Sequence, residues 1–232
     1  MRLIAIDTAL DACSVAVVDG QRLLAGASEV IGRGHAERLV AMIEVVMAEA
    51  GCSFADLDRI VATVGPGSFT GIRVGLATAR GLALAAGKPL VGILTLDAIA
   101  RSAPATGRSV LVALDARRGE TYARAYAADG RPLTEPQVLT LAAAADLALK
   151  RGADLLGSAA ALIAALAPGL GGVGDAAYPA IAAVAALGAV AAVGPIPPKP
   201  LYLRAPDAKP QHAGVIARAV PPMAGPVAKG AP

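Results

Sequence analysis

The sequence has few of the residues that build metal sites, disulfides and aromatic cores. Among its 232 residues are two cysteines, two histidines and no tryptophan, and aromatic residues make up only 3% of the chain. Cys13 and Cys52 are far apart and form no CxxC pair, which argues against a disulfide framework or a zinc site. His35 and His212 have no second histidine at metal-binding spacing, so a helix-borne His-x-x-x-His site is excluded. Alanine and aliphatic side chains must therefore fill the core.

The chain also lacks concentrated charge of either sign. Its formal net charge is +3, and its lysines and arginines are scattered without a long run. Composition alone therefore gives no argument for a nucleic-acid surface. The N-terminus lacks the basic-then-apolar pattern of a signal peptide because Asp7 and Asp11 come too early. We expect a cytoplasmic protein.

Residues 176–198 carry no charge, which raises the question of a membrane helix. Such a helix needs about 20 apolar residues. Here alanine dominates, which gains little on entering lipid, and Pro179, Gly188 and Gly194 interrupt the run. We expect no membrane contact, and instead two buried helices of a second domain at 158–167 and 180–187.

The first part of the chain follows the order β-β-β-α-β-α-β. Apolar, β-branched runs predict strands, and the Asp19-Gly20 pair predicts a hairpin. Gly51 and Gly87 follow the ends of two segments with helical composition. The expected strands are 3–6, 14–18, 22–28, 59–64 and 90–93, and the expected helices are 35–50 and 72–86.

The pattern restarts after residues 102–108, which hold Pro104 and Gly107 and suit a hinge. A strand at 110–114 ends at Asp115, much as the first strand ends at Asp7. We infer a second, degenerate copy of the same unit, with a further strand at 121–127, a helix at 141–150 and a strand at 155–157. The expected domains are 1–103 and 104–205, followed by a proline-rich segment at 206–232 whose end is a disordered tail.

A glycine-rich loop joins the strand at 59–64 to the next helix. It consists of Gly65, Pro66, Gly67, Ser68, Phe69 and Thr70. Its glycines permit unusual backbone angles and close approach, and a hydroxyl from Ser68 or Thr70 can cap the helix. Free N–H groups at a helix start favour an anion, but no Gly-Lys-Ser/Thr ends this loop, so it is not a P-loop. The residues leave an anion site and a plain tight turn equally open.

Four motifs in order resemble those of the bacterial TsaB (YeaZ) family. They are residues 65–73, residues 6–9 with 13–16, residues 115–120 and residues 202–204. The resemblance runs from Met1 to about Gln211 and is strongest up to about Arg124. It implies an α/β fold of two ribonuclease-H-like units in an actin-like (ASKHA) ATPase architecture.

The resemblance implies a non-catalytic scaffold subunit that activates a TsaD-like catalytic partner. That partner adds a threonylcarbamoyl group to N6 of adenosine 37 in tRNAs reading codons that begin with A. A TsaE-like ATPase would join the complex, and tRNA would be met through the complex. ATP and a metal ion are expected only in that assembly and not in the isolated chain, which can also form a homodimer.

One departure from the catalytic relatives supports the non-catalytic role. Those relatives carry a His-x-Glu-Gly-His metal motif where this chain has residues 95–99, Thr-Leu-Asp-Ala-Ile. Thr95 and Ile99 replace the two histidines, and isoleucine cannot ligate a metal. We therefore expect no metal site and no enzymatic activity of this chain alone.

Other functions stay open from the residues themselves: a stand-alone actin-like ATPase, a metalloprotease of the glycoprotease type, or a self-associating structural protein. Asp7, Thr8 and Asp115 end equivalent strands, and in ATPases of this fold such carboxylates organise Mg²⁺ and phosphate. We favour a vestigial nucleotide cleft, in which the carboxylates bind loop N–H groups, because no second nucleotide loop is evident. No Gly-x-Ser-x-Gly elbow is present either.

The two helices of the first domain predict a partner surface. Leu39, Met42, Ile43 and Val46 form one apolar stripe, and Val40, Val45 and Met47 widen it. A core pair explains this as well, but the resemblance implies docking against the same helices of a catalytic relative or a second copy. The stripe would lie at the centre of a four-helix bundle, with Met42 or Val46 exposed in the free chain.

The second helix has small residues every four positions, which favours close helix packing. The expected interface residues are His35, Leu39, Met42, Ile43, Val46, Gly71, Arg73, Gly75 and Ala79.

Overall fold

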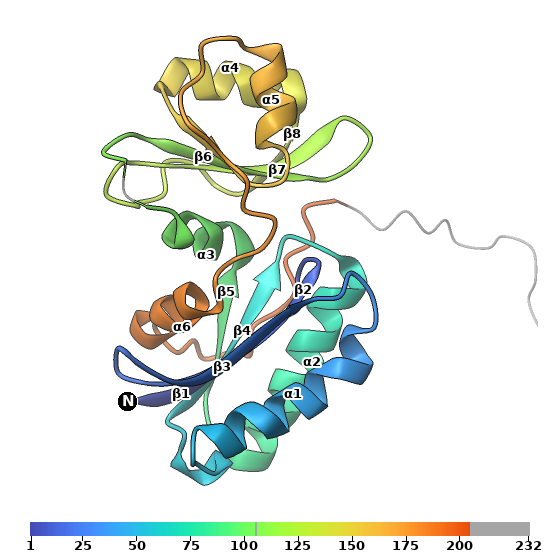
Figure 1. Ribbon diagram of the computed structural model, residues 1–232, viewed down its shortest axis with the longest axis vertical. Helices are drawn as coiled ribbons and strands as arrows, with labels where there is room; N and C mark the ends of the chain where they lie inside the picture. Colours follow the sequence, from blue (N-terminus) through green and yellow to red (C-terminus); the bar gives the residue numbers. More distant parts are fainter. Residues whose placement is uncertain (105, 205–232) are drawn as a thin grey trace, which may run out of the picture.

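The computed structural model describes residues 1–104 and 106–204. The described part contains two five-stranded sheets, connected by helix α3 (Thr95–Ser102) and drawn one above the other in Figure 1. We call each sheet with its covering helices a unit. The segment expected at 206–232 and its tail lie outside the described residues.

The first unit has strand order β3-β2-β1-β4-β5. Strands β1, β2 and β3 pair antiparallel, and β1, β4 and β5 pair parallel. Helices α1 (His35–Glu49) and α2 (Phe69–Ala86) cover one face of this sheet (Figure 1). The strands are β1 (Arg2–Asp7), β2 (Ala12–Asp19), β3 (Arg22–Val30), β4 (Arg59–Gly65) and β5 (Leu90–Leu94).

The second unit repeats this topology in the order β10-β9-β6-β7-β8. Here β6, β7 and β8 pair antiparallel, and β6, β9 and β10 pair parallel. The prediction of an α/β fold with two ribonuclease-H-like units in an actin-like arrangement is therefore confirmed. The elements are β6 (Val110–Asp115), β7 (Glu120–Tyr126), β8 (Gln137–Thr140), α4 (Leu141–Arg151), β9 (Asp154–Leu156), α5 (Ala160–Leu166) and β10 (Val173–Gly174).

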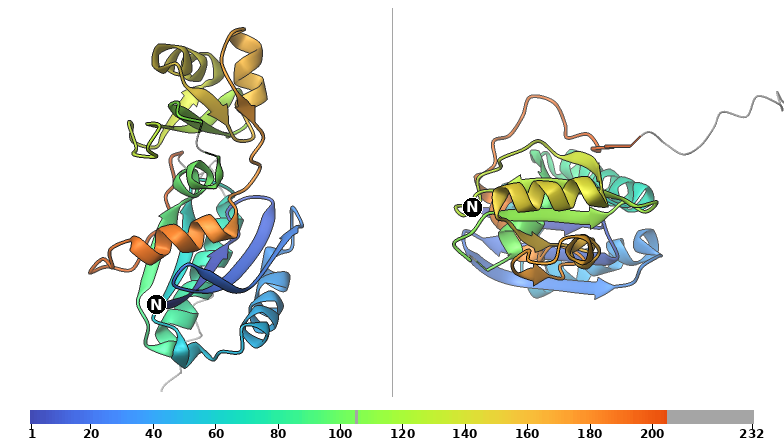
Figure 2. Two further views of the ribbon diagram at one scale, coloured as in Figure 1. Left: turned by 60° about the vertical axis from the view of Figure 1, so that its left-hand side comes forward. Right: turned by 90° about the horizontal axis from the view of Figure 1, so that it is seen from above.

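Helix α6 (Ile181–Val190) corrects one expectation, because it packs on the first sheet and not within the second unit. Val184 and Ala185 lie in one apolar cluster with side chains of β1, β4 and β5. Gly188 allows close contact, since a Cβ there would lie 2.4 Å from the Val61 side chain. Figure 2 shows the helix lying across the sheet face opposite α1 and α2. The chain returns from the second unit to the first beside the end of α3, where the Ala180 N–H donates to Ser102 Oγ at 2.9 Å.

The composition of α6 did not indicate which sheet it covers, because it is apolar on all sides. No helix in the described ranges has the length and apolar character needed to cross a membrane. The domain boundaries at 103 and 205 stay predictions.

The two units share a small apolar core beneath α3. Leu96 and Ile99 from α3 pack in one cluster with Val112, Leu114 and Tyr126 of the second sheet. Helix α3 was not expected from the sequence, because its eight residues are too few for a periodic pattern. Strands β8 and β10 were missed for the same reason.

After α6, residues 191–204 form a strap that leads from the α6 face of the first sheet to α2. The strap passes beside the edge strand β5, where Pro198 lies close to Gly92. The Leu201 N–H donates to the Val64 carbonyl at 2.7 Å, and the Arg73 Nε–H donates to the Tyr202 hydroxyl at 2.8 Å.

Candidate functional site

Asp7 ends β1 in a buried polar position. Its Oδ1 accepts hydrogen bonds from the Thr63 hydroxyl at 2.6 Å and from the Ala9 N–H at 3.2 Å. Its Oδ2 is also buried and has no hydrogen-bond partner in the described part of the chain. Burial raises the pKa of Asp7 to about 6, although the bonds from Thr63 and Ala9 oppose that shift. At neutral pH the Asp7 carboxyl group is therefore mostly ionised although it is buried.

Thr8 and the glycine-rich loop are packed against each other. The Thr8 hydroxyl donates to the Gly71 carbonyl at 2.7 Å, and the Ser68 N–H donates to the Ala9 carbonyl at 2.7 Å. A Cβ on Gly67 would lie 2.2 Å from the Ala9 oxygen, and one on Gly71 would lie 2.1 Å from the Thr8 oxygen. These glycines therefore serve close backbone packing.

The start of α2 is capped by its own chain. The Ser68 Oγ accepts from the Gly71 N–H at 3.3 Å, so two N–H groups of this turn already have protein acceptors. Of the two possibilities left open by the sequence, this geometry favours the tight turn over an anion site.

Asp115 ends β6 at the equivalent place in the second sheet. Its N–H donates to Ser158 Oγ at 3.0 Å, while its Oδ1 accepts from the Arg117 N–H at 2.8 Å. Its Oδ2 also pairs with the Arg117 guanidinium at 3.3 Å. Arg117 and Arg118 both have positive φ, at 65° and 58°, an uncommon backbone geometry for residues other than glycine.

A cavity of about 390 Å³ lies between the two units. Asp115 lines it, but Asp7 and Thr8 do not, because they are almost fully buried. The structure therefore brings one of the three predicted cleft residues to the cavity. The lining residues are Leu10, Asp11, Gly67, Ser68, Leu114, Asp115, Ala116, Arg117, Tyr122, Ser158 and Ala177.

Several polar groups at this cavity are already paired within the chain. Phosphates require free N–H groups or cations, but Ser68 and Gly71 donate within the chain and Arg117 pairs with Asp115. Asp11 and Asp115 are the two carboxylates that line the cavity. In addition, no group of three acidic, histidine or cysteine side chains suited to a metal occurs in the described ranges.

The predicted interface stripe on α1 is corrected by the structure. Leu39, Met42, Ile43 and Val46 are between 0% and 3% exposed and belong to the core of the first unit. His35 is also buried, and its Nε2–H donates to the Leu10 carbonyl at 3.0 Å. The stripe faces the chain's own sheet, so it cannot meet a partner without unfolding.

The small residues of α2 have a similar role. Gly75 faces β1, where a Cβ would lie 2.4 Å from Thr8 Oγ1, and Ala79 is fully buried in the core. With Gly71, they allow α2 to lie close to β1, so they form no external groove. Arg73 is exposed, but its guanidinium lies over the Phe69 ring at 3.6 Å and bonds Tyr202.

The exposed sides of α1 and α2 carry a different set of residues. Val40 and Val45 of α1 are 55% and 50% exposed, and Leu84 of α2 is 86% exposed. Val40 and Val45 were predicted to widen the apolar stripe of α1, whereas no role was predicted for Leu84. Around them are small residues and charges, which are Ala41, Glu44 and Ala48 on α1, and Ala77, Arg80, Gly81 and Ala85 on α2.

The two residues at the positions where the resemblance implies metal-binding histidines in the catalytic relatives are buried. Thr95 and Ile99 are both 0% exposed, and Ile99 belongs to the apolar cluster between the units. Asp97, between them, accepts hydrogen bonds from the Arg124 guanidinium and the Tyr126 hydroxyl, each at 2.6 Å. This segment therefore serves as a contact between the units.

Residues 28–172 match the model of a family described as TsaD, tRNA N6-adenosine threonylcarbamoyltransferase. Among curated proteins, the chain is 40% identical over 131 residues to the tRNA threonylcarbamoyladenosine biosynthesis protein TsaB of Escherichia coli. That match covers 56% of each chain. The chain spans about half the length of the curated relatives it matches.

Solved structures give broader coverage. A Pseudomonas aeruginosa protein described as similar to the peptidase YeaZ is 30% identical, with a TM-score of 0.74 over 88% of this chain and 99% of that one. YeaZ from Pseudomonas aeruginosa is also 30% identical, with a TM-score of 0.70 over 81% of this chain and 90% of that one. The chain belongs to the TsaB (YeaZ) branch of the protein family that the TsaD model describes.

Proposed function

We propose that this protein is a scaffold subunit in the synthesis of threonylcarbamoyladenosine in tRNA. It docks α1 and α2 against the same pair of helices of a TsaD-like catalytic relative and activates it. The catalytic relative transfers the threonylcarbamoyl group to N6 of adenosine 37 in tRNAs reading codons that begin with A. Membership of the TsaB family and the name of its Escherichia coli relative support this proposal.

The observation that carries the proposal is the set of exposed aliphatic side chains on α1 and α2. Val40 and Val45 are about half exposed, and small residues next to them leave a surface that another helix can approach. A few residues at the centre of an interface usually contribute most of the binding energy. Full burial of such a side chain contributes roughly 1.5–3 kcal/mol, so covering the exposed half of Val40 or Val45 contributes about half of that.

The chemistry at the cleft and at α3 supports a role without catalysis by this chain. Ile99, which the resemblance places at a metal-binding histidine of the catalytic relatives, is buried, and Asp7 and Thr8 do not line the cleft. We propose that ATP and a metal ion act only in the assembled complex. A TsaE-like ATPase and tRNA join through that complex, and the free chain forms a homodimer through the same helices.

The test of the interface is a double charge substitution on α1, Val40→Asp with Val45→Asp. Both side chains are exposed in the monomer, so the thermal midpoint should stay nearly unchanged at concentrations at which the isolated protein is monomeric. Co-purification with a co-expressed TsaD-like chain should be abolished. The matched control is Leu162→Asp on α5, which is 48% exposed in the other unit and should bind normally.

Normal binding by the double variant would place the interface elsewhere. The biological role is tested by depleting the protein and measuring threonylcarbamoyladenosine in bulk tRNA by mass spectrometry. The proposal expects a fall in the modified nucleoside while its adenylate precursor still forms. Unchanged modification in a cell with no second TsaB-like gene would refute the proposal.

A further inference from the structure

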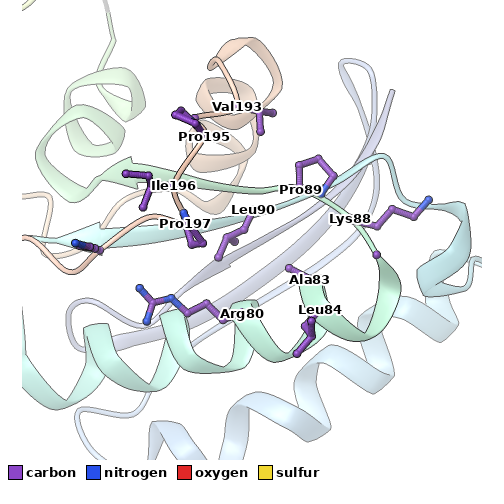
Figure 3. A pocket seen from close by; sticks show the side chains of 13 residues that line it. Arg80, Ala83, Leu84, Lys88, Pro89, Leu90, Val193, Pro195, Ile196 and Pro197 are labelled. Atoms are coloured by element: carbon purple, nitrogen blue, oxygen red, sulfur yellow. The ribbon is translucent and has the colours of Figure 1, made fainter.

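A groove of about 760 Å³ lies between the C-terminal half of α2 and the strap. Leu84 and Leu90 line it from α2 and β5, and Val193 and Ile196 line it from the strap (Figure 3). A second hollow of about 310 Å³ shares Leu90 and Ile196 with the groove and continues beside β5. Together they form a continuous depression along the edge of the first sheet.

The depression exists because the strap cannot complete the sheet. Strand β5 is the edge strand, and the strap beside it carries prolines at positions 195, 197, 198 and 200. Proline has no N–H group, so these residues cannot donate to the strand. Proline also restricts the backbone, which keeps this wall of the groove rigid and lowers the entropy cost of binding.

The groove leaves unusually large aliphatic surface in contact with solvent. Leu84 is 86% exposed, Ile196 is 67% exposed and Val193 is 48% exposed. Contiguous apolar surface on a folded protein is commonly a site of interaction.

The charged residues that line the groove are of one sign. Arg80, Lys88 and Lys199 line it, and no acidic residue does. Arg80 and Lys88 donate to the carbonyl groups of Pro198 and Ala55, and none of the three cations forms a salt bridge among the described residues. An occupant with acidic groups would therefore be complementary.

We propose that this groove binds a short segment of a partner protein in which aliphatic residues are flanked by aspartate or glutamate. Its volume falls within the roughly 300–1,000 Å³ of ordinary ligand clefts, which suits a short segment and not a folded domain. The chain's own residues 205–232 are a poor fit, because Lys209, Arg218 and Lys229 outnumber Asp207. The groove shares Arg80 and Leu84 with the exposed side of α2, but its other wall is the strap, and α2 runs between α1 and the strap in Figure 3.

The test uses the full chain and a display library of random peptides of about 12 residues. Selected peptides should combine aliphatic residues with aspartate or glutamate, and a synthetic consensus peptide should bind in fluorescence anisotropy. Ile196→Asp should weaken that binding at least tenfold, and Lys199→Glu should weaken it severalfold. Two matched controls, Leu162→Asp and Arg22→Glu, place the same changes on exposed positions away from the groove and should bind normally.

Three results would overturn the proposal. The first is selection of peptides without acidic residues, or binding that Ile196→Asp leaves intact while its thermal midpoint is unchanged. The second is displacement of the consensus peptide by a synthetic peptide of residues 205–232, which would make the chain's own end the occupant. The third is self-association of the chain, detected by light scattering, that Ile196→Asp abolishes. This result would mean that a second copy of the chain occupies the groove. Failure of the proposed function would leave this test unaffected, because no TsaD-like chain is present in it.

Discussion

At the scale of single residues, the buried end of β1 combines an unsatisfied carboxylate oxygen with backbone contacts that leave no room for a side chain. Asp7 holds two hydrogen bonds on one oxygen and none on the other within the described chain. The glycine-rich loop packs closely against the next two residues, Thr8 and Ala9. A Cβ added at Gly67 or Gly71 would clash with their carbonyl oxygens. Each of these features predicts a measurable effect on stability.

Asp7→Asn should change the pH dependence of stability. The pKa of Asp7 is raised from 3.8 to about 6 in the folded protein, so the folded state binds the proton more tightly. Its contribution to stability is complete below pH 3.8 and is lost as the pH rises through 6. The shift corresponds to about 3 kcal/mol.

Urea denaturation of both proteins across this range measures the effect. The wild-type protein should lose stability relative to Asp7→Asn mainly between pH 4 and 6, with a constant difference above that range. A difference that does not vary with pH would mean that Asp7 titrates normally.

Gly67→Ala should destabilise the protein by about 1–3 kcal/mol or more, because the new methyl group meets the Ala9 carbonyl oxygen. Gly81→Ala is the matched control in α2, where nothing lies within 4 Å of the added Cβ. That control should stabilise the protein by roughly 0.5–1 kcal/mol, as alanine is the better helix former. Equal midpoints for both variants in urea denaturation would contradict the packing described for the loop.

At the scale of secondary-structure elements, α6 depends on a residue far away in the sequence. The Arg59 guanidinium at the start of β4 donates to the carbonyl groups of Gly188 and Ala191, each at 2.9 Å. These carbonyls at the end of α6 have no partner within the helix. Helix α6 contains no polar side chain of its own. The Arg59 guanidinium therefore satisfies the last carbonyl groups of α6, as a C-terminal cap does in other helices.

Arg59→Met should lower stability by about 1–2 kcal/mol and loosen the end of α6. Hydrogen exchange of the amides at 187–191 should become faster, whereas exchange in α1 should not. Arg22→Met at the exposed start of β3 is the matched control. Unchanged exchange at the end of α6 would show that Arg59 is dispensable there.

Much of the element order was predictable, because the strands of the first unit and helices α1 and α2 are long enough to show periodicity. The placement of α6 on the first sheet was not predictable. A helix that is apolar on all sides has no polar face to indicate which sheet it covers. The sequence correctly predicted that apolar residues cover a wide arc of α1. It did not predict which part of that arc faces the chain's own sheet. Leu39 and its neighbours turn to the sheet, and Val40 and Val45 remain outside.

The candidate site was predictable in part. The parallel between Asp7 and Asp115 identified equivalent strand ends from the sequence. It did not reveal that packing of the glycine-rich loop against Thr8 and Ala9 keeps Asp7 out of the cleft. That outcome depends on backbone distances between segments far apart in the chain, which no local pattern encodes.

At the scale of the whole molecule, a buried polar network ties the two units together. Asp97 of α3 accepts hydrogen bonds from Arg124 and Tyr126 of β7. Burial and the nearby Asp97 carboxylate raise the pKa of Tyr126, so its hydroxyl stays a donor at all ordinary pH values. Arg124 is 8% exposed, so it depends on this carboxylate for its charge partner.

Asp97→Ala should therefore destabilise the protein by about 1–3 kcal/mol, because it leaves a buried guanidinium unpaired. Small-angle scattering should show a wider range of separations between the units. The double variant Asp97→Ala with Arg124→Met should recover part of the loss, since it removes the stranded charge. Purely additive losses in thermal unfolding would show that the two side chains are not coupled.

The return of α6 to the first sheet has a consequence for synthesis on the ribosome. During translation, the first five strands emerge early, but the helix that closes one of their two faces follows only after the whole second unit. Nascent chains usually fold from the N-terminus onward. This chain must keep a large aliphatic face of β1, β4 and β5 uncovered while the second unit is being made. Chaperones that hold exposed apolar strands should therefore engage the nascent chain most strongly between completion of β5 and the emergence of α6.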